Sequence, residues 1–225
     1  MRTYQMKILS ILALAFVATS CATPAPTLAT GPDVEVTFDG LVPIENSAFK
    51  KAWAAPDIDL DRYTKIMPGP AEFEFRAVRG GSSQRSHSSK NEFKISDANR
   101  QKLIDVVSEV FNEELAKSTR FTITDRPGPD VLILRGAVLD IVSRVPPEPM
   151  GRGDIYLSRF GEATIVLELS DSMSNETLLR AAERSAAETT GSRGMRVSPV
   201  TTWSEVRRMA RRWATKLRKG LDAIP

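Results

Sequence analysis

Cysteine and histidine are almost absent from this chain of 225 residues, which contains one of each, Cys21 and His87. One cysteine cannot close an intramolecular disulfide or supply a zinc cluster. His87 lies in a Ser-rich stretch that contains no acid, whereas a catalytic histidine needs an orienting partner on a rigid scaffold. The sequence therefore predicts no transition-metal site and no bound cofactor.

Familiar catalytic motifs are missing as well. Asp57, Asp59 and Asp61 alternate as in a calcium loop, but no glycine follows at the sharp turn and no glutamate closes the loop. Glu162 and Glu168 share one predicted strand face, about 20 Å apart, which is too far for the carboxylate pair of a glycosidase. The chain contains no Gly-x-Ser-x-Gly elbow. We therefore expect that it is not an enzyme.

Long apolar runs are confined to the N-terminus. Arg2 and Lys7 precede an apolar run at residues 8–17, which has the length of a secretory signal and is short for a transmembrane helix. Small side chains, ending with Ser20, stand directly before Cys21. The motif resembles a bacterial lipobox, so we predict cleavage between these two residues and acylation of the cysteine, palmitate included. The alternatives are an ordinary signal peptide beside a chance cysteine and an uncleaved anchor.

The predicted anchor divides the chain into three parts. Residues 1–20 form the signal peptide, residues 21–40 form a lipidated N-terminus with a flexible tether, and residues 41–225 form a periplasmic α+β domain. By resemblance to bacterial lipoprotein sorting, Ala22 in place of aspartate favours the outer membrane over retention in the inner membrane. We expect the protein to be lipid-anchored in the outer membrane, with its domain facing the periplasm.

The chain has little excess charge. Its formal net charge of +3 falls to +1 when Arg2 and Lys7 leave with the signal peptide, and this balance indicates no nucleic-acid partner. Cations are concentrated in the last predicted helix, namely Arg207, Arg208, Arg211, Arg212, Lys216, Arg218 and Lys219. Two interpretations stay open. They form either a solvated face that suits the helix dipole or a surface for an anionic envelope component or envelope protein.

Hydrophobic periodicity predicts one α+β domain. Apolar residues at helical spacing indicate helices at residues 96–118 and 202–223. Alternating or β-prone segments indicate strands at residues 34–38, 63–67, 71–78, 121–124, 131–142 and 161–170. Residues 178–188 are ambiguous, because their composition favours a helix and hairpin logic favours a returning strand. We expect a mostly antiparallel sheet of about five strands with two helices packed on one face.

Short motifs resemble those of an uncharacterised Gram-negative lipoprotein family with domain of unknown function 3313. They are Asp39-Gly40-Leu41-Val42, Asn46-Ser47, Pro56, Asp59-Leu60, Tyr63, Gly128-Pro129-Asp130-Val131, Gly161-Glu162-Ala163-Thr164 and Arg211-Arg212-Trp213-Ala214 with Leu217. The resemblance covers nearly the whole mature chain. It implies an envelope lipoprotein with a compact α/β domain, favours a strand at residues 178–188, and supplies no catalytic residue. The cationic insert at residues 79–90 is not a feature that we associate with this family.

These observations together predict a lipid-anchored periplasmic binding or accessory protein of the cell envelope. Its contact with the membrane would be the N-terminal lipid. One rival is a cell-wall or lipid hydrolase with an unrecognised site, which a pocket holding two close carboxylates would favour. The other rival is a purely structural envelope spacer, which a surface with neither a cleft nor a charged patch would favour.

Overall fold

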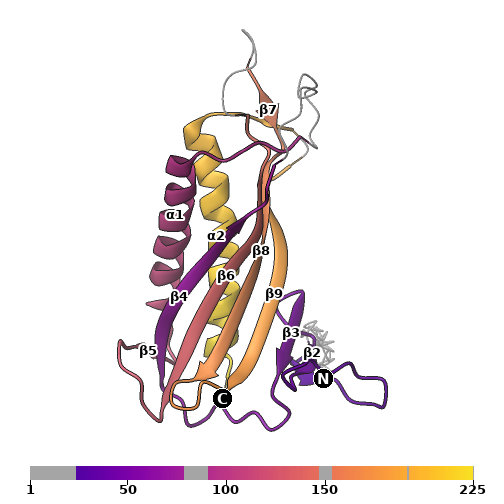
Figure 1. The fold of residues 1–225 in the computed structure, drawn as a ribbon, viewed down its shortest axis with the longest axis vertical. Coiled ribbons are helices and arrows are strands. Elements are labelled where there is room, and N and C mark those ends of the chain that lie inside the picture. The colour runs from indigo at the N-terminus through magenta and orange to yellow at the C-terminus, as the bar shows by residue number, and fades with distance from the viewer. Residues whose placement is uncertain (1–23, 79–90, 147–153, 192, 225) are drawn as a thin grey trace, which may run out of the picture.

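The computed structural model describes residues 24–78, 91–146, 154–191 and 193–224. In these ranges the chain forms one large sheet, a small two-stranded ribbon and two helices (Figure 1). The elements in chain order are β1 Thr27–Leu28, β2 Val42–Glu45, β3 Lys51–Ala54, β4 Lys65–Phe75, α1 Asp97–Leu115, β5 Thr122–Ile123, β6 Val131–Ser143, β7 Tyr156–Leu157, β8 Arg159–Asp171, β9 Thr177–Glu188, β10 Met195–Arg196 and α2 Pro199–Asp222.

The predicted sheet of about five mostly antiparallel strands is wrong. Over the described residues the large sheet has eight strands in the order β1-β2-β3-β9-β8-β6-β4-β5, and it is mixed. Strand β4 pairs in parallel with both β6 and β5, whereas β6, β8, β9 and β3 pair antiparallel. The reason is the crossover through α1, which carries the chain from the end of β4 back to the start of β6, as a parallel pair requires.

Both helices lie on one face of this sheet and cover its apolar side (Figure 1). On β8 the predicted inward set Ala163, Ile165, Leu167 and Leu169 is buried, as strict alternation requires. The residues that alternate with this set point to the opposite face of the sheet. That face carries charged pairs such as Arg180 with Glu168 (2.7 Å). The core therefore lies between the helix pair and one face of the sheet.

The ambiguous segment at residues 178–188 is a strand, as the family resemblance implied. Its composition favours a helix, but β9 pairs along its length with β8 and at its start with β3. A central strand satisfies backbone groups on both edges, and small residues such as Ala181 and Ala187 let the helix layer approach closely. Tertiary pairing thus overrides local preference.

The two helices begin where their capping residues stand. Ser96 caps α1 through the amide of Asn99, and α1 then buries an apolar stripe that includes Leu103, Val107 and Val110. Helix α2 begins a few residues before the predicted start. Ser198 and Thr201 form a capping box there, and Pro199 occupies the first turn.

Three local expectations about the sheet fail. Residues 34–38 were expected to form a strand, but they form none. The short strands β2 and β3 were not predicted. Strand β4 continues through the predicted break at residues 68–70, because a register shift between Pro68 and Ala71 accommodates the prolines as an irregularity against β6.

Candidate ligand-binding site

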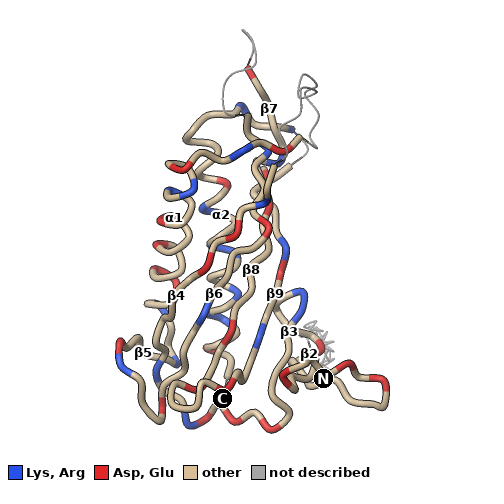
Figure 2. The backbone as a smooth tube through the Cα atoms, in the orientation of Figure 1, with Lys and Arg blue, Asp and Glu red and all other residues tan. Residues whose placement is uncertain are grey.

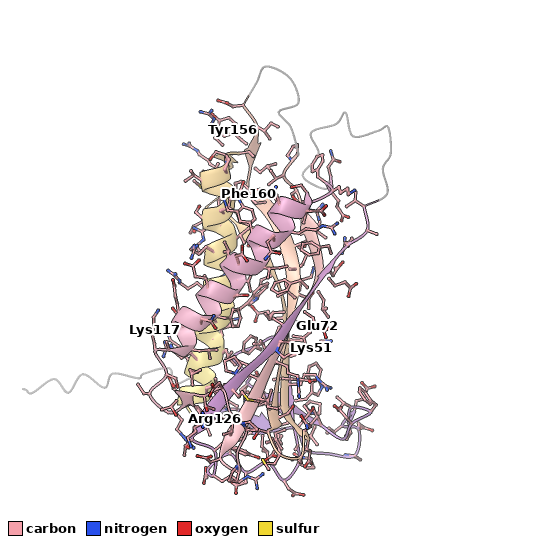
Figure 3. All side chains as sticks on the ribbon, turned by 60° about the vertical axis from the view of Figure 1, so that its left-hand side comes forward. Lys51, Glu72, Lys117, Arg126, Tyr156 and Phe160 are labelled. Carbon is pink, nitrogen blue, oxygen red and sulfur yellow. The ribbon has the colours of Figure 1, made fainter. Side chains whose placement is uncertain are left out.

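A cavity of about 590 Å³ opens between the helix layer and the sheet, at the end of the molecule where both helices begin. Its wall comes from the first half of α1, the first two-thirds of α2 and the facing ends of β6 and β8. Phe160, labelled near this end in Figure 3, forms part of it. The volume falls within the range of about 300–1,000 Å³ typical of small-molecule sites.

The inner wall of the cavity is apolar. Helix α1 contributes Leu103 and Val107, and α2 contributes Val206, Met209 and Trp213. Strands β6 and β8 complete it with further aliphatic side chains, among them Val138, Ile141 and Ala163. A wall of this kind attracts hydrocarbon and offers little to a polar ligand in the interior.

The rim of the cavity is polar. It includes both helix caps, Ser96 and Ser198, and two cations, Lys94 and Arg196. The Arg196 side chain forms an ion pair with Asp154 (3.1 Å). Polar groups gathered around an apolar interior orient a ligand that has one polar end.

Glu162 also lines the cavity, and two guanidinium groups hold its carboxylate. It accepts a hydrogen bond from Arg144 (2.5 Å) and lies 3.4 Å from Arg184. Burial raises the pKa of Glu162, but the Arg144 hydrogen bond and the nearby arginine charges outweigh this effect, so that its pKa is lowered. The carboxylate is therefore ionised at neutral pH and is a poor proton donor.

Most cations of α2 are engaged within the domain. The two helices run parallel, so that Arg207 meets Glu109 (2.8 Å) and Arg211 meets Glu113 (3.0 Å). Figure 2 shows the charged residues along both helices. The other cations with partners are Arg208 with Glu205 and the Glu188 carbonyl, Arg212 with the Ala186 carbonyl, Lys216 with Glu183, and Arg218 with Glu114 and Asp222.

These contacts show that the main role of the cations in the structure is to stabilise the packing of α2 against α1 and β9. Lys219 is exposed, and its side chain makes no hydrogen bond or ion pair with the described residues. The sequence did not reveal these acidic partners on α1. A signal was present, because Glu109 and Glu113 are separated by the same number of residues as Arg207 and Arg211. Binding of an anionic partner by these cations stays a prediction.

A second polar cluster fastens the turn between β8 and β9. The buried Asp171 carboxylate accepts hydrogen bonds from the Tyr63 hydroxyl (2.7 Å), from Arg62 (2.9 Å) and from the amides of Met173 (2.7 Å) and Ser174 (2.8 Å). The Ser174 amide and the Tyr63 hydroxyl are the main reasons why the pKa of Asp171 falls to about 2. Every acceptor position faces a protein donor, so the cluster stabilises the turn and is not a reactive site.

Several predicted features lie outside the described residues. Ser20, Cys21 and His87 are among them, so the lipidation site and the only histidine have no structural account.

Within the described ranges, no group of three or more His, Cys, Asp or Glu side chains could hold a metal ion. The described helices also include none that is long and apolar enough to span a bilayer. In the stretch predicted as a tether, β1 pairs with β2.

The fold and the cavity define a two-layer domain, a mixed sheet covered on one face by two parallel helices, with an apolar pocket at one end of the interface. The chain belongs to the family described as protein of unknown function (DUF3313), whose model matches residues 34–217. This confirms the family resemblance. No curated protein matches the chain.

Several solved structures show weak likeness. PelC from Paraburkholderia phytofirmans, crystallised as a dodecamer, is 9% identical at a TM-score of 0.34, with 74% of this chain and 94% of that chain covered. A Xanthomonas campestris protein of family DUF330 is 11% identical at a TM-score of 0.36, with 83% and 90% covered. A Helicobacter pylori homologue of a neuraminyllactose-binding hemagglutinin is 11% identical at 0.32, with 73% and 83% covered. Likenesses this weak support no inference about function.

Residues of the family motifs occupy structural positions. The Ser172 hydroxyl accepts a hydrogen bond from the amide of Gly128 and donates one to its carbonyl. Asp130 forms an ion pair with Lys65 (2.9 Å). At Gly161 an added Cβ would lie 2.5 Å from the Val142 carbonyl oxygen, so a side chain is excluded there. In these positions the residues maintain the fold, and their contacts reveal no activity.

Proposed function

We propose that this chain is a lipid-anchored protein of the outer membrane whose periplasmic domain acts by binding a ligand. The lipobox-like sequence before Cys21 supports the anchor. The observation that carries the binding function is the cavity of about 590 Å³, which has an apolar interior and a polar rim. Membership of a family of unknown function is compatible with this role and supplies no competing activity.

The rival functions fit the geometry less well. A hydrolase of the retaining or inverting kind needs one carboxyl group that can donate a proton. Two carboxylates line the cavity, but the pKa of Glu162 is lowered and Asp154 is paired with Arg196 (3.1 Å). A purely structural spacer has no use for an apolar cavity, since an unfilled one reduces stability. We therefore favour binding over both.

The anchor is tested by Cys21→Ser. We expect this variant, produced in a Gram-negative host, to move from the membrane fraction to the soluble periplasmic fraction, because no acyl chain can be attached. Ser20→Ala is the matched control, since it keeps a small side chain before the cleavage point. We expect Ala22→Asp to shift the protein from the outer to the inner membrane. A Cys21→Ser chain that remains in the outer membrane would contradict the proposed anchor.

An anionic envelope component is the proposed partner of the cations on α2. Reversing one charge with Arg207→Glu should reduce capture of that component from crosslinked cells and should also cost up to about 1 kcal/mol, because the pair with Glu109 is broken. A swapped variant, Arg207→Glu with Glu109→Arg, restores the internal pair. We expect it to regain stability but not capture. If the swapped variant captures as much as the unmodified protein, Arg207 has only a structural role.

A further inference from the structure

The cavity follows the first turns of both helices. Its lining residues extend along α1 from Ser96 to Val107 and along α2 from Pro199 to Trp213, which corresponds to about 17–21 Å of helix at a rise of ~1.5 Å per residue. An unbranched chain that lies along the helices would follow this arrangement of lining residues.

The interior matches hydrocarbon in chemistry as well as in shape. An apolar cavity of ~150 Å³ is already large enough to bind benzene, and this one is about four times that volume. Met209 and Trp213 on α2 line the cavity together with Ile141 and Ala163 of the sheet, so both the helix side and the sheet side are apolar. Met209 has an unbranched side chain that adapts to irregular shapes. The cavity can therefore accept a flexible ligand.

The rim favours negative charge. The two acids that line the cavity are both neutralised, Asp154 by Arg196 (3.1 Å) and Glu162 by Arg144 (2.5 Å) and Arg184 (3.4 Å). Lys94 remains, and it forms no ion pair within the part of the chain that the structure describes. Both helices begin at this rim, so their dipoles add positive potential there.

We propose that the cavity binds the hydrocarbon chain of a single-chain anionic amphipath, with its charged group beside Lys94. The chain lies between α1, α2 and the ends of β6 and β8. Fatty acids and lysophospholipids share this chemistry. The inference deepens the proposed function, because it names the class of ligand for the same binding site.

The position of the cavity suits a ligand that travels through water. The first described residues lie at the opposite end of the molecule from the cavity (Figure 1). Only residues 22–26 separate Cys21 from β1, and α2 spans about 36 Å between the two ends. A domain held at residue 21 would present the cavity away from its own membrane. Single-chain amphipaths cross such a gap more readily than two-chain lipids, because they expose less hydrocarbon to water.

The test measures binding to the mature chain carrying Cys21→Ser, purified without detergent. The probes are saturated fatty acids of increasing length, the matching alkyl-trimethylammonium ions, lysophosphatidylglycerol, and vesicles of two-chain phosphatidylglycerol. We expect affinity for the fatty acids to rise about fourfold per added methylene until the cavity is filled, and then to level off. We expect the lysophospholipid to bind and the vesicles not to bind. Affinity that is independent of chain length would overturn the proposal.

Two variants locate the ligand. Lys94→Glu should weaken fatty-acid binding about tenfold and leave the trimethylammonium ions unaffected or bound more tightly. Lys50→Glu, which changes an exposed lysine far from the rim, is its control. Met209→Trp fills the interior and should shorten the longest chain that binds. Its control is Met67→Trp on strand β4, outside the cavity lining. Fatty-acid binding that Lys94→Glu leaves unchanged would overturn the placement of the anionic group.

The outcomes separate this inference from the proposed anchor. Membrane fractionation of the Cys21→Ser variant tests only the lipid anchor. Ligand binding by the purified chain tests only the cavity. An unfolded Met209→Trp variant, detected by circular dichroism, would still leave Lys94→Glu as a decisive measurement, because Lys94 is exposed. A correctly anchored protein that binds none of the single-chain probes would overturn the inference and leave the anchor intact.

Discussion

Trp213→Ala is expected to lower the free energy of unfolding by about 3–5 kcal/mol, among the largest losses that one substitution can cause here. Trp213 is fully buried on α2 and packs where the helix layer meets the sheet. Its removal deletes a large apolar contact and extends the cavity into the core. Because domains of this size are stable by about 5–15 kcal/mol, the loss should be plain in urea denaturation monitored by circular dichroism.

Two further variants separate volume from hydrogen bonding at this position. The indole nitrogen of Trp213 donates a hydrogen bond to the Ser185 hydroxyl on β9 (2.9 Å). Ser185→Ala keeps the indole but removes its acceptor, which should cost about 1–3 kcal/mol. Trp213→Phe keeps most of the apolar volume and should fall between the two. If Trp213→Ala is no less stable than Ser185→Ala, the indole does not pack in the core as described.

Asp171→Asn is expected to lower the free energy of unfolding by about 2 kcal/mol at neutral pH, with an effect that disappears in acid. The pKa of the Asp171 carboxyl is about 2 in the folded protein and 3.8 in its ordinary state. A depressed pKa means that the folded state favours the carboxylate. The stabilisation is therefore complete above about pH 4 and is lost as the pH falls through about 2.

The measurement compares urea denaturation of both proteins between neutral pH and pH 2. The two stability curves should begin to approach each other below about pH 4, where the unfolded chain binds the proton. They should lie closest at pH 2, where the folded carboxyl also begins to be protonated. Asp125→Asn is the matched control, since the side chain of Asp125 is 94% exposed. A constant difference between Asp171→Asn and the unmodified protein over the whole range would contradict an ionised, hydrogen-bonded Asp171.

Local patterns in the sequence were sufficient for the elements that bury one regular face. Helix α1 and strand β8 follow their apolar periodicity, because each packs a single side against the core. Strand β9 was different. Its composition pointed to a helix, and the family resemblance rather than any local signal favoured the strand. The short strands β2 and β3 have too few residues for a period to be visible.

Pairing between strands was beyond the reach of local patterns. The sequence indicated strands on both sides of α1, but it did not indicate that β4 and β6 are neighbours and parallel. The same limit applies to the site. Ser96 and Ser198 cap different helices about 100 residues apart, and only the fold brings both to one rim. The Asp171 cluster is similar, since Tyr63 lies 108 residues away from it.

The sequence by itself determined the family, the apolar faces of both helices and of strand β8, and the prediction of a lipidated cysteine. These properties depend on neighbouring residues, which local periodicity and short motifs record. Only the tertiary structure decided the mixed sheet, the pairing of the α2 cations with acids on α1, and the cavity. Each of these depends on which surfaces meet, because burial and electrostatic energies are set by distances in space and not by separation along the chain.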